Sequence, residues 1–416
     1  MTDFLTIQPP TTLRAEIQLP ASKSISNRAL IINAISGSGT WPENVSCCDD
    51  TRVMVKALTE RPETIDILAA GTAMRFLSAY LSVTPGTHTL TGTERMRHRP
   101  IAVLVEALRT LGAQVEYAGE EGFPPLRITG GRHRGGALSL PASVSSQYIS
   151  ALLMIGPTLA EGLTLCLEGE LVSRPYIEMT LSLMRHYGAE VRWMDERTIR
   201  VQPVPYRPTA FCVENDWSAA GYWYEMVALS PDPKAEIILP GLYKDSTQGD
   251  SRIRDFFLPL GVHTAFTPEG VRLRKSGQPP VAHLELDLVN QPDLAQTLVA
   301  TCAMLGVTFR FTGLQSLKIK ETDRIHALRT ELAKLGFLVS EAYDRILYWQ
   351  GERTEPLPAL AIDTYDDHRM ALALAPCCLR TGRPLRINHP QVVSKSYPQF
   401  WTDLRQAGFH LSEEQT

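Results

Sequence analysis

One local pattern recurs along this 416-residue chain at a nearly constant interval. In each copy an amphipathic helical segment runs into a glycine, and a short segment typical of a β-strand follows. The five glycines, separated by 76, 73, 75 and 72 positions, are Gly112, Gly188, Gly261, Gly336 and Gly408. A glycine just after a helix can adopt the left-handed conformation that ends the helix. The pattern therefore predicts a repeated helix-to-strand unit.

An earlier, degraded copy is expected in residues 54–67, where the helix ends near Arg61. That end lies only about 50 positions before Gly112, so this first unit is predicted to be short and to lack a hairpin. About six units result, which we group as three plus three. Alternating strands and helices indicate the α/β class, and a chain of this length favours two domains over a single core.

Composition and charge exclude several classes of protein. Apolar residues make up 44% and charged residues 21%, an ordinary balance for a globular protein. The net charge of −4 argues against a nucleic-acid or membrane-surface protein but leaves room for a local basic pocket. The N-terminal residues lack a signal-peptide pattern, and no apolar run reaches the roughly 18 residues of a membrane helix. We therefore expect a cytoplasmic protein.

The seven cysteines predict neither a metal site nor a redox motif. Their number is odd, and they form no CxxC pair and no spacing typical of a metal site. Reduced, structural thiols are the simplest interpretation. We expect no bound metal.

Several predicted helices begin with small polar residues and carry basic residues nearby. Ser22 or Ser24 is expected to cap the first helix, and later helices begin at Gly71–Thr72, at Ser145–Ser146 and at Ser173. The free N–H groups and the dipole of a helix N-terminus attract anions. Ordinary capping explains each start taken singly, whereas several starts aimed at one cleft would hold strongly anionic substrates.

Short motifs spread over nearly the whole chain, and their order is what makes them specific. The motifs are LPASKSISNRAL at 19–30, AGTAMRF at 70–76, RHRPI at 97–101, SVSSQYISALLM at 143–154, LVSRPYIEMTL at 171–181, QGD at 248–250, QPDLAQT at 291–297, KETDRI at 320–325, YDDHRMALA at 365–373 and SKSYPQF at 394–400. In this order they resemble the motifs of the 5-enolpyruvylshikimate-3-phosphate synthases, a family of enolpyruvyl transferases.

The resemblance implies a two-domain, inside-out α/β barrel in which each domain consists of three βαβαββ repeats. It places the chain crossings near Pro20–Ala21 and Val213–Asn215. One domain, which binds the substrate phosphate and has a shortened first repeat, would be residues 21–214. The other would be residues 1–20 plus 215–416, with the active site in the cleft between the domains.

The resemblance also implies an activity, the transfer of the enolpyruvyl group of phosphoenolpyruvate to the 5-hydroxyl of shikimate 3-phosphate. The reaction would proceed by addition and elimination and would release phosphate. It would be a step of the shikimate pathway, which leads to chorismate and the aromatic amino acids. This chemistry needs a base for the hydroxyl, an acid for the methylene carbon and cations around the phosphate. It needs no cofactor and no metal, and relatives suggest a monomer. The two substrates bring roughly six negative charges, which guanidinium forks match well.

Carried over position by position, the resemblance predicts three overlapping sets of residues. Shikimate 3-phosphate would be bound by Lys23, Ser24, Arg28, Ser145, Ser146, Gln147, Ser173, Tyr176, Asp293, Ser316 and Lys320. Phosphoenolpyruvate would be bound by Lys23, Gly71, Thr72, Arg99, Gln147, Arg324, Arg369 and Lys395. The catalytic residues would be Lys23, Asp293, Lys320, Glu321, His368 and Lys395.

Individual roles follow from the same resemblance. Asp293 would accept the proton of the attacking hydroxyl, and Glu321 would protonate the methylene carbon. Arg75 would support the site from behind, and Arg174 would neighbour the shikimate phosphate.

The spacing in KETDR carries an argument of its own. Lys320, Glu321 and Arg324 are expected to lie in one helical turn. Lys320 and Arg324 would then be like charges four positions apart on one face, which is unfavourable unless an anion lies between them. The spacing therefore favours a ligand site.

Three departures from the family pattern are visible. Ala69 stands where relatives usually have a polar residue, and Ser316 stands where relatives tend to have asparagine. The stretch between Asp49–Asp50 and Gly71 is short. These departures bear on affinity and remove no charged catalytic group.

Two alternatives stay open at this point. The first is the related transferase that acts on UDP-N-acetylglucosamine, which usually carries a reactive cysteine in a mobile loop. Residues 49–165 contain no cysteine. The second is a catalytically inactive homologue that still binds the ligands, which the changes at Ala69 and Ser316 motivate.

Overall fold

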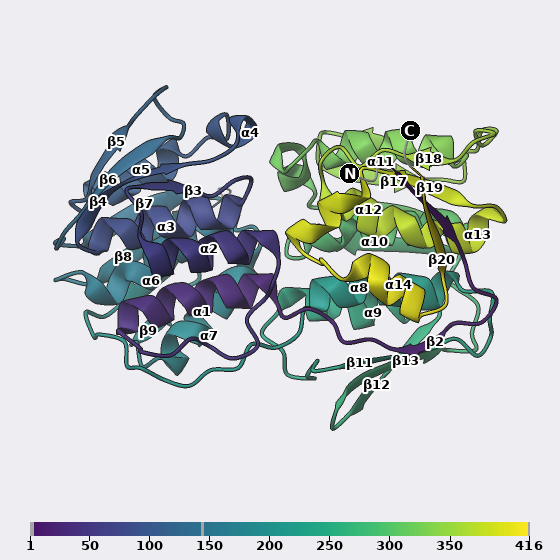
Figure 1. The fold of residues 1–416 in the computed structure, drawn as a ribbon, viewed down its shortest axis with the longest axis horizontal. Helices are drawn as coiled ribbons and strands as arrows, with labels where there is room; N and C mark the ends of the chain where they lie inside the picture. The colour runs from purple at the N-terminus through teal and green to yellow at the C-terminus, as the bar shows by residue number, and fades with distance from the viewer. Residues whose placement is uncertain (1–3, 143–144, 415–416) are drawn as a thin grey trace. The chain divides into compact units, whose positions relative to one another are not determined.

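The computed structural model describes residues 4–142 and 145–414. The chain divides into two compact units, one of residues 21–213 and one of residues 1–20 with 214–416. We call them the 21–213 unit and the 214–416 unit (Figure 1). Among the described residues, no helix is long and apolar enough to cross a membrane.

The 21–213 unit holds two four-stranded sheets, with strand orders β3-β4-β6-β5 and β7-β8-β10-β9. Its elements are α1 (Lys23–Ser36), α2 (Asp49–Glu60), β3 (Thr64–Asp66), α3 (Gly71–Val83), β4 (Gly86–Thr91), α4 (Glu94–Arg97), α5 (Ala102–Thr110), β5 (Gln114–Tyr117), β6 (Leu126–Gly130), β7 (Gly136–Pro141), α6 (Ser146–Ile155), η1 (Gly156–Thr158), β8 (Leu163–Glu168), α7 (Arg174–His186), β9 (Val191–Trp193) and β10 (Thr198–Val201).

The 214–416 unit holds three four-stranded sheets, with orders β2-β11-β13-β12, β14-β15-β17-β16 and β18-β19-β1-β20. Its elements are β1 (Phe4–Gln8), β2 (Arg14–Glu16), α8 (Trp217–Leu229), β11 (Glu236–Pro240), η2 (Gly249–Arg252), α9 (Ile253–Phe257), β12 (Val262–Thr267), β13 (Gly270–Lys275), β14 (His283–Asp287), η3 (Pro292–Leu294), α10 (Ala295–Leu305), β15 (Thr308–Thr312), η4 (Gln315–Ile319), α11 (Arg324–Lys334), β16 (Ser340–Ala342), β17 (Ile346–Trp349), β18 (Ala361–Ile362), α12 (His368–Leu374), η5 (Ala375–Cys377), α13 (Cys378–Thr381), β19 (Leu385–Asn388), η6 (Pro390–Lys395), α14 (Phe400–Gln406) and β20 (His410–Glu414).

All five sheets repeat one topology. In four of the sheets the first strand pairs in parallel with the second, and the fourth strand lies antiparallel between the second and the third, as in the pairs β3–β4, β4–β6 and β5–β6. In the sheet of β18, β19 and β20, the N-terminal strand β1 takes the place of the fourth strand. This is the predicted βαβαββ repeat. The N-terminal segment belongs to the 214–416 unit because β1 pairs with β19 and β20 and β2 pairs with β11.

The first repeat of the 21–213 unit is short, as predicted. It contributes α1 and α2, but residues 37–48 hold an isolated bridge between Glu43 and Cys212 in place of a strand of a sheet.

Four of the five glycines of the sequence pattern directly follow the C-cap of their helix as expected, whereas Gly261 follows a turn after α9, which ends at Phe257. At Gly112, φ is 105°, a conformation that residues with a side chain rarely adopt. Its N–H bonds to the carbonyl of Arg109, and the N–H of Ala113 bonds to the carbonyl of Leu108. This pair of bonds is the Schellman motif. The other four glycines also have a positive φ, between 85° and 94°.

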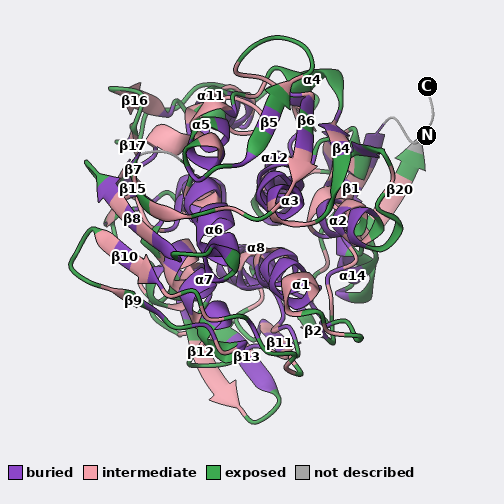
Figure 2. Ribbon diagram, turned by 90° about the vertical axis from the view of Figure 1, so that its left-hand side faces the viewer, coloured by how far each residue is buried: buried purple, intermediate pink, exposed green. Residues whose placement is uncertain are grey.

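Helices buried on every side form the interior of each unit, while the sheets lie outside them. Figure 2 shows α3 and α6 almost entirely buried, and in α3 the buried residues run without a break from Gly71 to Ser82. In the 214–416 unit, α12 is buried along its whole length. A helix that is apolar all round must sit inside a core. The polar residues of α12, His368 and Arg369, stand at its N-terminal end, and the candidate site begins at such helix starts.

Candidate active site

Four helix N-terminal halves meet in the 21–213 unit. Arg28 of α1 donates from Nε to Thr180 Oγ1 of α7 at 2.7 Å and from Nη2 to Ser150 Oγ of α6 at 3.1 Å. Gln147 of α6 donates to Thr72 Oγ1 of α3 at 3.0 Å. The structure thus brings together the N-terminal halves of α1, α3, α6 and α7, and the dipole and free N–H groups of a helix start favour an anion.

Serines stand at three of these N-termini. Ser22, rather than Ser24, caps α1 by accepting from the N–H of Ile25 at 3.4 Å. Ser145 caps α6 by accepting from the N–H of Gln147 at 3.3 Å. Ser173 precedes α7 with φ 56° and ψ 37° and makes no capping bond with its side chain. Such a left-handed residue costs about 1–3 kcal/mol and is typical of functional sites.

Arg28 is a buried cation bonded to neutral oxygens. Its side chain is 2% exposed, and its third hydrogen bond goes to the carbonyl of Ser24 at 2.9 Å. The guanidinium also lies 5.2 Å from the ring centre of Phe76 and 5.9 Å from that of Tyr176. Burial lowers the pKa of Arg28 to about 10. Burial disfavours the charged form of Arg28, and a bound anion would offset this cost. The guanidinium would therefore attract an anion strongly.

Lys23 opens α1 and pairs with an acid that our sequence analysis did not select. Its Nζ lies 3.2 Å from Oδ2 of Asp50, whose side chain is 5% exposed. Asp50 lies in the first turn of α2. The Asp49–Asp50 pair was visible in the sequence, but nothing in its spacing pointed to Lys23.

Two arginines converge on the first residue of α3. A Cβ at Gly71 would lie 2.7 Å from Nη1 of Arg99 and 3.2 Å from Nη1 of Arg75. Arg75 also donates to the carbonyl of Gly71 at 3.0 Å. Gly71 is therefore a glycine because arginines occupy the space of its side chain, which sets two guanidinium groups beside a helix N-terminus. Ala69, two residues earlier, is exposed.

The remaining predicted residues of this unit lie at the same helix starts. Ser146 and Tyr176 are half-buried in the first turns of α6 and α7. Arg174 instead faces Trp193, with its guanidinium 4.7 Å from a ring centre, and lies 3.4 Å from Glu178. Residues 143 and 144 of the SVSSQY motif lie outside the described residues.

A second group of charges lies in the 214–416 unit, with Asp293 at its centre. One carboxylate oxygen lies 3.1 Å from Arg324 Nη1 and 3.5 Å from Lys320 Nζ, and the other lies 3.0 Å from Arg369 Nη2. Burial opposes ionisation of Asp293, but the charges of Arg369, Lys320 and Arg324 outweigh it. They hold the pKa of Asp293 well below its usual range.

Glu321 links two further cations. Its Oε2 lies 2.9 Å from Arg324 Nη2, and its Oε1 accepts from Lys395 Nζ at 2.8 Å. Lys395 ends η6, so this contact joins segments 74 residues apart. Residues from KETDR, PDL, DDHR and SKS thus form one network.

Arg324 is held from behind by Asp367, a residue that sequence analysis overlooked within the DDHR motif. Nε donates to Oδ2 at 2.7 Å and Nη2 donates to Oδ1 at 3.2 Å. Asp367 also caps α12 by accepting from the N–H of Arg369 at 2.9 Å. His368 begins α12 and is buried, with Nδ1 3.6 Å from Asp367.

The predicted helical turn at KETDR is wrong. Lys320 follows η4 with an extended backbone, and α11 begins only at Arg324, where Asp323 caps it by accepting from the N–H of His326. Because Asp323 bonds to the backbone of α11 as its N-cap, the helix does not extend to the residues before it. Lys320 and Arg324 nevertheless have an anion between them, the carboxylate of Asp293. Ser316 is half-buried on η4.

Two more ionisable groups border this network. Burial, and then the charge of Asp293, raise the pKa of Asp250 to about 6, and Asp250 accepts from Ser218 Oγ at 2.5 Å. Burial raises the pKa of Tyr222 to about 12, and its hydroxyl oxygen accepts from Arg369 at 3.3 Å. Asp250 lies in the quoted QGD motif, whereas no sequence pattern pointed to Tyr222.

Known proteins are similar to this chain in sequence and in fold. A family model described as EPSP synthase (3-phosphoshikimate 1-carboxyvinyltransferase) matches residues 7–60 and 58–404. A 3-phosphoshikimate 1-carboxyvinyltransferase of Bacteroides fragilis is 60% identical over 402 residues, which cover 97% of each chain. One from Vibrio campbellii is 36% identical over 435 residues, covering 97% of this chain and 99% of its own.

Two solved structures have the same fold. EPSP synthase from Acinetobacter baumannii matches with a TM-score of 0.79 at 23% identity, over 99% of this chain and 100% of its own. The enolpyruvyl transferase NikO from Streptomyces tendae matches with a TM-score of 0.74 at 15% identity, over 100% of both. These likenesses confirm the predicted enolpyruvyl transferase-like α/β fold. The family model and the relatives show that this chain belongs to the EPSP synthase (3-phosphoshikimate 1-carboxyvinyltransferase) family.

Proposed function

We propose that this chain transfers the enolpyruvyl group of phosphoenolpyruvate to the 5-hydroxyl of shikimate 3-phosphate and releases phosphate. The observation that carries the proposal is the pair of charged groups described above. One combines helix N-termini with arginines, and the other surrounds two carboxylates with cations. We propose that both groups serve the same reaction, in a cytoplasmic monomer that uses no cofactor.

Anion binding is divided between the helix starts and the arginines. Shikimate 3-phosphate would take the N-termini of α1, α6 and α7, where Arg28 is already oriented by two hydroxyl groups. Phosphoenolpyruvate would take the N-terminus of α3 with Arg99, together with Arg324, Arg369 and Lys395. Guanidinium groups suit both phosphate and carboxylate because their N–H forks donate two parallel hydrogen bonds.

The proposed chemistry is an addition followed by an elimination. Asp293 takes the proton of the 5-hydroxyl as its oxygen attacks C2 of phosphoenolpyruvate, and Glu321 gives a proton to C3. The tetrahedral intermediate then loses phosphate as C3 gives up a proton and the double bond forms again. Lys23, Lys320 and Lys395 stabilise the negative charge that develops on the phosphate.

The cations around Asp293 explain how a poor base could become effective. In the structure they hold its pKa low, so the carboxylate has little affinity for a proton. Bound phosphates and carboxylates would draw Arg369, Lys320 and Arg324 into new ion pairs. In that state we expect the pKa of Asp293 to rise. A cation that also pairs with a substrate anion lowers the pKa of the carboxyl group less than a cation that pairs with the carboxylate alone.

Phosphate release by the purified protein tests the proposal. The reaction contains phosphoenolpyruvate with shikimate 3-phosphate, and UDP-N-acetylglucosamine serves as the control acceptor in the presence of a chelator. Release with shikimate 3-phosphate alone supports the proposed function. Release with the nucleotide sugar instead would identify the other transferase, and no release despite calorimetric binding would identify an inactive homologue.

A further inference from the structure

A strained turn in the 214–416 unit lies directly before the cluster that contains Asp367 and Arg369. Between β18 and α12, Tyr365 and Asp366 both have φ of 54°, the left-handed region. Neither is a glycine, and two such residues in succession are unfavourable. Backbone of this kind persists where its surroundings impose it. The neighbours of this turn therefore decide whether it keeps its shape.

A buried carboxylate of α11 holds the turn at two points, one before the strained pair and one within it. The side chain of Glu331 is fully buried. Its Oε2 accepts from the N–H of Asp363 at 3.0 Å, before the pair, and its Oε1 accepts from the hydroxyl of Tyr365 at 2.6 Å. Burial and the charge of Glu331 raise the pKa of Tyr365, so this hydroxyl keeps its proton and donates.

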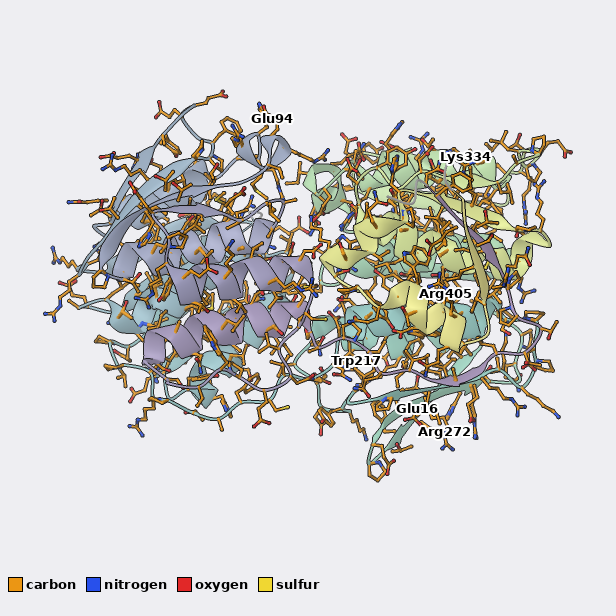
Figure 3. All side chains as sticks on the ribbon, viewed as in Figure 1. Glu16, Glu94, Trp217, Arg272, Lys334 and Arg405 are labelled. Atoms are coloured by element: carbon orange, nitrogen blue, oxygen red, sulfur yellow. The ribbon has the colours of Figure 1, made fainter. Side chains whose placement is uncertain are left out.

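The carboxylate of Glu331 has its own counter-ion. Lys334, labelled in Figure 3, lies 2.8 Å from Glu331 and donates to Oδ2 of Asp363 at 2.7 Å. Asn388 donates to the other oxygen of Asp363 at 2.7 Å. A buried carboxylate needs such partners to remain charged. The carboxylate of Glu331, which we call the anchor of the turn, thus has its counter-ion and its hydrogen bonds without any residue of the candidate site.

The same helix fastens the turn a second time. Arg324 and Glu331 lie seven positions apart on α11, about two helical turns, and so project from the same face. Glu331 binds the start of the turn and Arg324 binds Asp367 at its end. The direction in which Arg324 points toward Asp293 therefore depends on where the turn places Asp367.

We propose that Glu331 and Tyr365 are positioning residues that set the orientation of Arg324 and Arg369 by holding this left-handed turn. The inference rests on the proposed function, in which these two arginines bind phosphoenolpyruvate. Loss of the anchor would let the turn relax toward ordinary torsions and move Asp367 with it. Binding of phosphoenolpyruvate would weaken, whereas Arg28 and the helix starts of the 21–213 unit would still bind shikimate 3-phosphate.

The chain provides a matched control. Tyr343 and Asp344 form a second Tyr-Asp pair in the left-handed region, with φ of 54° and 55°, in the loop between β16 and β17. Tyr343 is 84% exposed. Tyr343→Phe and Tyr365→Phe each remove one hydroxyl from the same local conformation. Only the second removes a hydrogen bond to a buried carboxylate.

Steady-state kinetics with each substrate varied in turn, together with amide hydrogen exchange across residues 361–372, test the inference. For Tyr365→Phe we expect KM for phosphoenolpyruvate to rise roughly fivefold, as loss of one hydrogen bond of about 1 kcal/mol implies. KM for shikimate 3-phosphate should stay within about twofold of wild type, and exchange across 361–372 should accelerate. Tyr343→Phe should change none of these quantities. Glu331→Gln should act in the same direction as Tyr365→Phe.

A merely structural role would give a different result. It would lower kcat and the melting temperature while leaving the ratio of the two KM values unchanged, and that outcome overturns the proposal. An unaltered exchange rate in Tyr365→Phe overturns it as well. This second readout does not depend on turnover. Wild-type protein that releases no phosphate would therefore refute the proposed function, while the exchange data would still decide whether Tyr365 holds the turn.

Discussion

Asp367 and Arg324 form a two-pronged ion pair whose side chains are at most 2% exposed. Asp367 accepts from Nε and Nη2 of Arg324. Nη1 donates to Asp293, and Nη2 also donates to Glu321. A guanidinium is planar and its forks have a fixed geometry. Asp367 thereby decides the direction in which Arg324 presents its remaining donors to the two carboxylates to which we assign proton transfer.

Asp367→Asn is expected to destabilise the protein strongly. It removes the charge that compensates a buried guanidinium, and we expect the free energy of unfolding to fall by about 2–4 kcal/mol, because Asp293 and Glu321 remain as partial partners. Urea denaturation measures the change. Asp255→Asn, which breaks an exposed pair with Arg252, should cost less than about 1 kcal/mol. Equal losses in the two variants would contradict the assignment.

Thr180→Val should weaken the binding of shikimate 3-phosphate. It is close to isosteric and removes the hydroxyl that accepts from Arg28 Nε at 2.7 Å. A hydrogen bond to a charged group contributes about 1.5–3 kcal/mol, so the dissociation constant should rise by roughly tenfold or more. Titration calorimetry gives this number directly. Thr59→Val, at an exposed threonine of α2, is the control, and a similar loss there would remove the support for Arg28 as the ligand.

Gly71→Ala should impair phosphoenolpyruvate binding without unfolding the protein. The new Cβ would lie 2.7 Å from a flexible arginine side chain, so Arg99 must move away. We expect KM for phosphoenolpyruvate to rise by about tenfold or more, which corresponds to roughly 1.4 kcal/mol. Gly39→Ala, where a Cβ meets nothing within 4 Å, should leave KM unchanged. A wild-type KM in Gly71→Ala would show that Arg99 does not bind phosphoenolpyruvate in this position.

The stability of the protein should depend on pH through Asp250. Its pKa is raised from 3.8 to about 6 by burial and by Asp293, so the folded state holds this proton more tightly than the unfolded state. The resulting stabilisation is fully present below about pH 4 and is lost as pH rises to about 6. Asp250→Asn removes this dependence. Relative to wild type, the variant should therefore gain about 2 kcal/mol between pH 4 and pH 7 in denaturant titrations. A difference that does not change with pH would show that Asp250 is ionised throughout.

Local features of the fold were predictable because local spacing encodes them. The five glycines after amphipathic helices, the helix starts at Ser145 and Ser173 and the short first repeat follow from neighbouring residues alone. The helical turn expected at Lys320 failed for a local reason too. Asp323 caps the next helix by accepting from the N–H of His326, and the chain before it stays extended.

The sequence by itself determined the repeat, the class of fold, the family and the order of the motifs. It could not show which charged side chains meet, because those meetings join residues that lie far apart along the chain. Lys23 pairs with Asp50 across 27 positions, and Asp293 binds Arg369 across 76. Asp367 meets Arg324, and Glu331 meets Asp363, only because α11 packs against the turn of residues 363–367. Burial then shifted the pKa values of Arg28, Asp250 and Tyr222, since desolvation exists only in the folded core.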